Sequence, residues 1–188
     1  MGFDDATNTY KIVRVSGDQK STICKLVSQI YVLGTSSWRE IPSFPPCNLS
    51  DSRAFAYGNQ HWLVCLPDPS LSSYGGVVSI CSFNFRKEEF YGRIIPLPEH
   101  MHNKSVRCMG IPKHLHLLSL RGSLAIVDTS SDDYNIEIWV LKNYDKKEWN
   151  LDYKIDKSVL RGKMMMNLIC CEWKHGIYFT HPRCHRSL

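Results

Sequence analysis

Residues 136–149 read Ile136-Glu-Ile-Trp-Val-Leu-Lys-Asn-Tyr-Asp-Lys-Lys-Glu-Trp149, which is an apolar run, a short polar turn and an aromatic residue. The same order recurs in Ile30-Tyr-Val-Leu-Gly-Thr-Ser-Ser-Trp38-Arg-Glu-Ile-Pro42 and in Ile80-Cys-Ser-Phe-Asn-Phe-Arg-Lys-Glu-Glu-Phe90, which continues to Pro98. The three aromatic residues recur at intervals of roughly 50 to 60 residues, and a period of about 50 residues with several strands per unit is typical of propeller-like β arrays.

A second repeated element alternates with these hairpins. Gly58-Asn-Gln-His-Trp-Leu, Gly122-Ser-Leu-Ala-Ile and Gly176-Ile-Tyr-Phe each place a glycine in a turn before an apolar strand. Two consecutive hairpins make one four-stranded propeller blade. The two repeats in phase therefore predict a succession of such blades.

The rest of the chain is also rich in short strand patterns, and no segment has the length and periodicity of an amphipathic helix. We expect strands or hairpins at Tyr10–Val15, 22–33, Trp38–Ile41, Arg53–Leu66 (with a turn at Gly58-Asn59), Val77–Phe85, Phe90–Leu97, His114–Leu120, Ser123–Val127, Ile136–Leu141, Trp149–Ile155, Leu168–Cys171 and Gly176–Phe179. The predicted class is all-β, a partial and open propeller-like array of about three blades built from short antiparallel strands.

Composition limits the possible functions. The chain has 188 residues, 43% of them hydrophobic and 22% charged, which is typical of a globular protein rather than a disordered one. The formal net charge of +5 is spread along the chain instead of forming one basic face, so we do not expect nucleic-acid binding. No apolar run is long enough to cross a membrane, and the polar N-terminus lacks the pattern of a secretory signal. We expect a cytoplasmic or nuclear protein.

The chain has eight cysteines but no pair with CxxC spacing. Cys65 and Cys81 lie inside apolar strand patterns, where a thiol acts as a small buried apolar group. Reduced, structural cysteines are therefore the expectation.

The ordered set of motifs resembles the F-box-associated domain of plant F-box proteins from about residue 3 to about residue 156. The resemblance is carried by Tyr10-Lys-Ile-Val-Arg-Val, the two hairpins that contain Trp38 and Trp149, Gly58-Asn-Gln-His-Trp-Leu, Ser82-Phe-Asn-Phe-Arg-Lys-Glu-Glu-Phe with Ile95-Pro-Leu-Pro, and Leu120-Arg-Gly-Ser-Leu. The family fold is propeller-like and related to kelch repeats.

This resemblance implies a protein-interaction module without enzymatic activity of its own. In that family an N-terminal F-box binds a Skp-type adaptor, and the associated domain recruits the protein target of an SCF-type cullin-RING ubiquitin ligase. No F-box pattern is present here, and Tyr10 matches the middle of the family's early region. We therefore expect a domain truncated at its N-terminal side (residues 1–156), followed by a divergent extension (residues 157–188) with one further hairpin and a tail.

The departures leave three interpretations open. The chain is a protein-binding module that reaches SCF components only through another chain, a carbohydrate- or small-molecule-binding β domain, or a non-functional truncated remnant. An array of about three blades also falls short of the four or more that closed propellers have, so its strand edges are expected to stay open or to be completed by another chain.

Two Cys/His-rich stretches suggest zinc as an alternative to purely structural roles. The first consists of His100, His102, Cys108, His114 and His116, and the second of Cys170, Cys171, His175, His181, Cys184 and His185. A half-exposed strand accounts for the first, and buried cysteines with a loose tail account for the second. We expect no metal, no cofactor and no catalytic residue, because no nucleophile or phosphate-loop context accompanies these residues.

The tryptophans and three loops are the remaining candidates for a site. We interpret Trp38, Trp62, Trp139, Trp149 and Trp173 as blade-packing residues rather than interface hot spots. Trp38 and Trp149 follow turns and are expected to cover a neighbouring strand; as a buried aromatic, Trp149 would cost about 3–5 kcal/mol on truncation to Ala. A binding face, if present, is expected in the loops Pro67–Gly76, His100–Lys113 and Asp128–Asn135.

Overall fold

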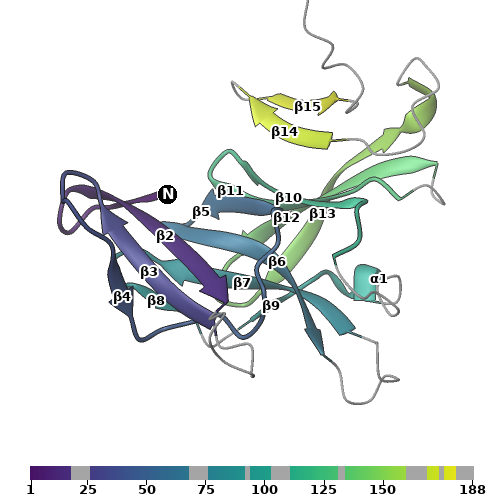
Figure 1. Ribbon diagram of the computed structural model, residues 1–188. Coiled ribbons are helices and arrows are strands. Elements are labelled where there is room, and N and C mark those ends of the chain that lie inside the picture. Colours follow the sequence, from purple (N-terminus) through teal and green to yellow (C-terminus); the bar gives the residue numbers. More distant parts are fainter. Residues whose placement is uncertain are drawn as a thin grey trace, which may run out of the picture.

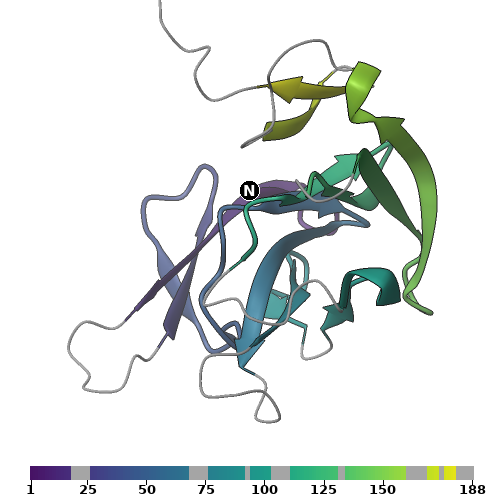
Figure 2. The same cartoon turned by 90° about the vertical axis from the view of Figure 1, so that its right-hand side faces the viewer.

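The computed structural model describes residues 1–17, 26–67, 76–91, 94–102, 111–130, 134–159, 169–173 and 176–180. Within these ranges the chain forms antiparallel sheets that follow one another in sequence and stand side by side (Figures 1 and 2). This arrangement confirms the predicted all-β, open propeller-like fold.

Three sheets, which we call blades 1, 2 and 3, make up most of the fold. Blade 1 comprises β1 (Gly2–Asp4), β2 (Thr9–Gly17), β3 (Leu26–Val32) and β4 (Arg39–Ile41). Blade 2 comprises β5 (Arg53–Ala56), β6 (Asn59–Pro67), β7 (Gly76–Asn84) and β8 (Glu89–Phe90), with β9 (Ile95–Pro96) beside β7. Blade 3 comprises β10 (Leu115–Leu120), β11 (Ser123–Asp128), β12 (Asn135–Asn143) and β13 (Glu148–Asp156).

The remaining described elements are small. A hairpin of β14 (Ile169–Trp173) and β15 (Gly176–Thr180) follows blade 3, and β14 contacts β10. The helical segments of the described chain are the single turn α1 (Glu99–His102) and a 3-10 turn at Lys157–Val159. No helix in the described ranges has the length and apolar character needed to cross a membrane.

Two predictions differ in detail from the structure. The strand β1 was missed, because three residues are too few to show a periodic pattern; it pairs with β2 and gives blade 1 its fourth strand. The predicted strand Phe90–Leu97 is two short strands, β8 and β9, whose pairing register along β7 is not continuous. The break lies between Phe90 and Ile95, whereas Pro96 and Pro98 limit how far β9 continues, because proline cannot donate a ladder hydrogen bond.

Two of the three repeated glycines mark tight hairpin turns, as predicted, whereas Gly176 is the first residue of β15. Tyr57 and Gly58 both have positive φ angles (52° and 71°), and so do Arg121 and Gly122 (51° and 79°). Two consecutive residues with positive φ are the requirement of a type I′ turn, and glycine adopts this conformation without steric cost. The first turn lies one residue earlier than the predicted Gly58-Asn59.

Blade 2 is buried on both faces, because blade 1 packs on one face and blade 3 on the other. Side chains that alternate along its strands therefore enter different clusters. Trp62 and Val64 of β6 point to a cluster shared with blade 1, which also contains Ile30. Leu63, between them in sequence, points to a cluster shared with blade 3, which also contains Ile126. The near-continuous apolar sequence of β6 follows from this double burial.

Blade 1 is different, because only one of its faces is covered. Ile30 is fully buried against blade 2. The opposite face of the sheet carries aromatic rings. Phe3 packs against Tyr10 (centroids 5.0 Å apart) and Trp38 against Tyr31 (5.4 Å), and these rings remain partly open to solvent. Blade 1 therefore has an apolar outer face among the described residues.

Candidate functional site

A groove of about 660 Å³ lies where blade 2 meets the outer hairpin of blade 3. Its wall from blade 2 is the segment Pro96–Glu99, which joins β9 to α1. The opposite wall consists of Trp139 on β12, Trp149 on β13 and the turn residues Lys146 and Lys147. Figure 2 shows α1 beside the β12–β13 hairpin. We call this feature the inter-blade groove.

The two tryptophans form a fixed apolar surface in this groove. Both pack one side against the apolar cluster that blades 2 and 3 share, and both are only partly buried. The indole nitrogen of Trp149 donates a hydrogen bond to the carbonyl oxygen of Pro96 at 3.0 Å, which ties the two walls together. The indole nitrogen of Trp139 donates to a carboxylate oxygen of Glu137 at 3.3 Å. Both rings are therefore held in place before any ligand binds.

The charges of the groove come from its turn residues. The ammonium group of Lys147 lies 3.9 Å from the centre of the Tyr144 ring and donates to the Tyr144 carbonyl oxygen. The side chain of Lys146 is exposed, and so is that of Glu99 across the groove. The lining thus carries two cations and one anion around an apolar centre.

The groove was not among the predicted binding regions. Most of the loops Pro67–Gly76 and His100–Lys113, and three residues of Asp128–Asn135, lie outside the described residues. A usable signal was present in the sequence, because Pro96-Leu-Pro98 and Trp149 belong to the repeated motif. Their meeting across two blades depends on packing, which periodicity does not show.

The tryptophans occupy three different environments. Trp62 is buried between blades 1 and 2, where its ring lies 6.0 Å from that of Phe90. Trp38 covers Tyr31 on the neighbouring strand, as predicted, and the Arg14 guanidinium lies 4.5 Å from its ring centre. The expectation of a fully buried Trp149 is wrong, because one side of the ring faces the groove. Nothing is described of the Trp173 side chain.

The suggested zinc stretches fall largely outside the described part of the chain. Cys108 and the tail histidines and cysteine (His181, Cys184, His185) are not described, and neither are the side chains of His100, His102, Cys170 and Cys171. His114 lies 3.9 Å from the Asp128 carboxylate, at the start of β10. The described residues contain no cluster of three or more metal-ligating side chains.

A serine–histidine pair is present, but it is inside the protein. Nδ1 of His61 lies 2.7 Å from the Ser82 hydroxyl, and Nε2 lies 3.0 Å from the Ala56 carbonyl oxygen. Burial lowers the pKa of His61 to about 4, so the ring is neutral at pH 7. Ser82 is itself buried. This pair satisfies polar groups between strands and offers no accessible nucleophile.

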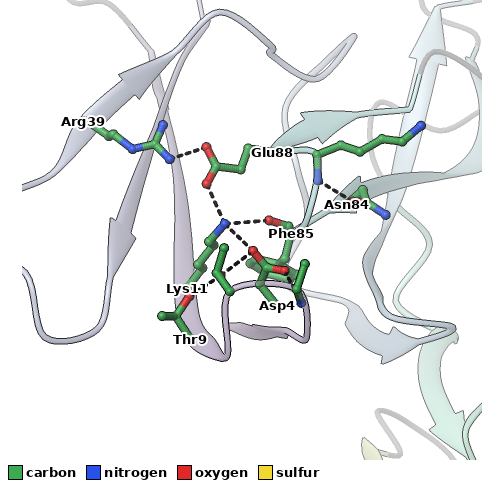
Figure 3. A network of polar contacts seen from close by, with 10 residues as sticks. Asp4, Thr9, Lys11, Arg39, Asn84, Phe85 and Glu88 are labelled. Carbon is green, nitrogen blue, oxygen red and sulfur yellow. Dashed lines mark hydrogen bonds and ion pairs between the residues drawn. The ribbon is translucent and has the colours of Figure 1, made fainter.

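A buried ionic network joins blade 1 to blade 2 (Figure 3). The ammonium group of Lys11 lies 2.7 Å from the Asp4 carboxylate and 2.7 Å from that of Glu88, and it donates to the Phe85 carbonyl oxygen at 3.2 Å. Arg39 also pairs with Glu88. The hydrogen bond from Lys11, with that from Thr7, lowers the pKa of Asp4 to about 2.

The same network also shifts the pKa values of Glu88 and Lys11. Burial alone disfavours the charged forms of Glu88 and Lys11. It is outweighed by the hydrogen bonds and charge attraction of Lys11 with Asp4 and Glu88, and of Glu88 with Lys11 and Arg39. The pKa of Glu88 is consequently lowered and that of Lys11 is raised. All charges of the network are used within the fold, so we assign it to blade packing rather than to ligand binding.

Comparison with known proteins agrees with this architecture. The sequence model of a family described as the F-box associated beta propeller domain matches residues 1–171. The chain belongs to this family. The match runs through blades 1, 2 and 3 and ends within β14.

A curated relative is an F-box protein from Arabidopsis thaliana, which is 27% identical over 167 residues. The alignment covers 86% of this chain but 42% of that protein. This chain thus spans less than half the length of the relative that it matches. Together these matches confirm the resemblance seen in the sequence motifs and support a role in protein interaction.

Proposed function

We propose that this chain is a protein-binding domain that recruits a target to an SCF-type cullin-RING ubiquitin ligase. Membership of the F-box associated family is the observation that carries the proposal. The similarity to an Arabidopsis F-box protein supports it, because an F-box is the part that links such a protein to the ligase. Contact with the ligase then requires an F-box, either in a longer product or in a partner chain.

The structure is compatible with recognition rather than chemistry. The His61–Ser82 pair and the Lys11 network are engaged in packing, whereas the inter-blade groove presents preformed apolar surface to solvent. Shallow apolar grooves with a few charged groups at their margin are common sites for protein partners. We further propose that the domain acts in the cytoplasm or nucleus, which a fluorescent fusion in plant cells would test.

The proposal is tested by purifying the tagged chain from plant cells and identifying the proteins that accompany it. A core variant, Leu63→Asp, serves as an unfolding control, because it places a charge at a fully buried position between two blades. A specific partner should be retained by the native chain and lost with the control. Purified partner and chain should then bind each other directly.

Ubiquitination is tested with a chimera in which the F-box of the Arabidopsis relative precedes this chain. The chimera should lower the level of the identified partner, and inhibition of cullin activation should restore it. A partner that binds the chain but stays stable with the chimera would contradict the ligase role and leave only the interaction role. Absence of any direct partner would contradict both.

A further inference from the structure

The inter-blade groove has the features of a site for one kind of ligand. We propose that it binds an extended, proline-containing segment of a partner protein, with an acidic side chain placed at Lys146. This inference rests on the proposed interaction role and adds the place and the chemistry of recognition. It follows from the backbone, the aromatic surface and the charge of the groove, in that order.

The backbone of the groove excludes recognition by an added strand at this wall. Pro96 and Pro98 have no N–H group, so the segment Pro96–Glu99 cannot offer a regular ladder of donors. The Pro96 carbonyl oxygen already accepts from the Trp149 indole. At this wall side-chain contacts are therefore favoured over strand pairing, and polyproline II segments dock into aromatic-lined grooves in that way.

The aromatic surface suits such a segment. Trp139 and Trp149 present partly exposed rings whose other sides rest on the shared apolar cluster. Leu97 and Pro98 fill the base of the opposite wall, where both are buried. Proline and aliphatic side chains gain from apolar contact, and a polyproline II segment loses little conformational entropy on binding because it is extended beforehand.

The polar groups of the groove favour a peptide over a sugar. Carbohydrate hydroxyls need several converging donors and acceptors. Both indole N–H groups of the groove are already paired, that of Trp149 with Pro96 and that of Trp139 with Glu137. The remaining charged side chains of the lining are Lys146, Lys147 and Glu99. Of the two lysines, Lys146 extends into solvent whereas Lys147 lies on Tyr144, so a carboxylate is best placed at Lys146.

The test uses the indole N–H signals in the nuclear magnetic resonance spectrum of the ¹⁵N-labelled full chain. The protein has five tryptophans, and Trp139→Phe and Trp149→Phe assign the two groove signals. The probe is a synthetic peptide of about ten residues with repeated Pro-Leu-Pro and two central glutamates, which spans roughly 30 Å as polyproline II. Matched probes replace the glutamates by lysines, or the prolines by alanines.

The glutamate probe should shift the Trp139 and Trp149 signals in a saturable manner and leave that of buried Trp62 in place. We expect affinity to fall about three- to fivefold or more with the lysine probe and with alanine in place of proline. Lys146→Glu should weaken binding of the glutamate probe by a similar factor. The matched control Lys113→Glu, an exposed lysine outside the groove, should not.

Three results with the synthetic probes would overturn the inference. These are no shift of either groove signal at millimolar probe, equal binding of the glutamate and lysine probes, and shifts produced only by an oligosaccharide such as cellohexaose. If the partner from plant cells still binds the Lys146→Glu chain with unchanged affinity, recruitment stands and the groove is not its site. If the native chain binds no partner from plant cells at all, the interaction role itself is contradicted.

Discussion

The role of a single residue in this protein depends on the face of the blade on which its side chain lies. Trp62 and Trp149 belong to the same class of strand-associated tryptophans in the sequence. The structure buries the first between two blades and leaves the second half-open at the groove. The energetic consequences of removing them should therefore differ.

We expect Trp62→Ala to lower the free energy of unfolding by about 3–5 kcal/mol, because it leaves a cavity between blades 1 and 2. Trp149→Ala should cost about 2 kcal/mol, since part of its ring faces solvent and its hydrogen bond to Pro96 contributes about 1 kcal/mol. Urea denaturation measures both. Tyr153→Ala, on an exposed part of β13, is the control and should change stability by less than about 0.5 kcal/mol. Equal losses at the two tryptophans would contradict the assignment.

His61 makes stability depend on pH. Its pKa is lowered from 6.5 to about 4 by burial, so the unfolded chain takes up this proton at a higher pH than the folded chain. The stabilisation is fully present above pH 6.5 and is lost as the pH falls toward 4, with a total of about 3 kcal/mol. Unfolding measured between pH 7.5 and 4.5 should show this decline. His61→Gln should flatten it.

At the scale of elements, the network around Lys11 fixes blade 1 against blade 2. Its residues come from β1, β2, β4 and the turn before β8, so no single hairpin contains it. Gly2 on β1 also lies so close to the Phe85 ring that an added Cβ would collide with it. Close approach and buried charge together hold the first sheet in place.

Replacing Glu88 by Gln removes one of the two carboxylates that balance buried Lys11. We expect a loss of about 1–3 kcal/mol, the usual cost of a hydrogen bond to a charged group. Amide exchange in β2 and β3 should accelerate more than exchange in β10 and β11, because blade 1 is released first. Lys87→Gln breaks a comparable but exposed pair with Glu89 and should have almost no effect. Uniform acceleration across all blades would disprove a local clamp.

The contribution of the same network to stability is lost in acid, as expected for carboxylates whose pKa is lowered by folding. Asp4 and Glu88 stabilise the fold above their ordinary pKa values, and this contribution is lost as the pH falls through their lower folded values. We therefore expect blade 1 to open first in an acid titration followed by amide exchange. In the Glu88→Gln chain this opening should begin at a higher pH.

At the scale of the whole molecule, neighbouring blades share apolar clusters, and blade 3 has a further cluster of its own on its other face. One apolar cluster joins blades 2 and 3, and another joins blades 1 and 2. A substitution in a shared cluster should destabilise both sheets that contribute to it. Independent hairpins would not show this coupling.

Leu63→Ala tests this coupling, because Leu63 is fully buried in the cluster of blades 2 and 3. We expect a loss of about 2–5 kcal/mol and faster amide exchange in both β6 and β11. Leu33→Ala, at an exposed leucine of blade 1, should change stability by less than about 0.5 kcal/mol. Faster exchange in blade 2 alone would show that the two sheets are energetically independent.

The sequence by itself determined the strands, the turns and the family. The apolar runs, the in-phase aromatic residues and the glycines of the type I′ turns are local features, because each depends on backbone conformation within a few residues. They placed most strands within a few residues of their observed bounds. The exceptions are β1, which is too short to show a period, and the predicted strand Phe90–Leu97, which is two short strands, β8 and β9.

Only the tertiary structure decided which residues meet between blades. Lys11 and Glu88 are far apart in sequence, as are Pro96 and Trp149, and no local preference brings either pair together. Alternation along a strand shows that a residue faces one side or the other, but it does not show which neighbouring sheet lies there. The ionic network and the inter-blade groove arise from that packing, so they became visible only with the fold.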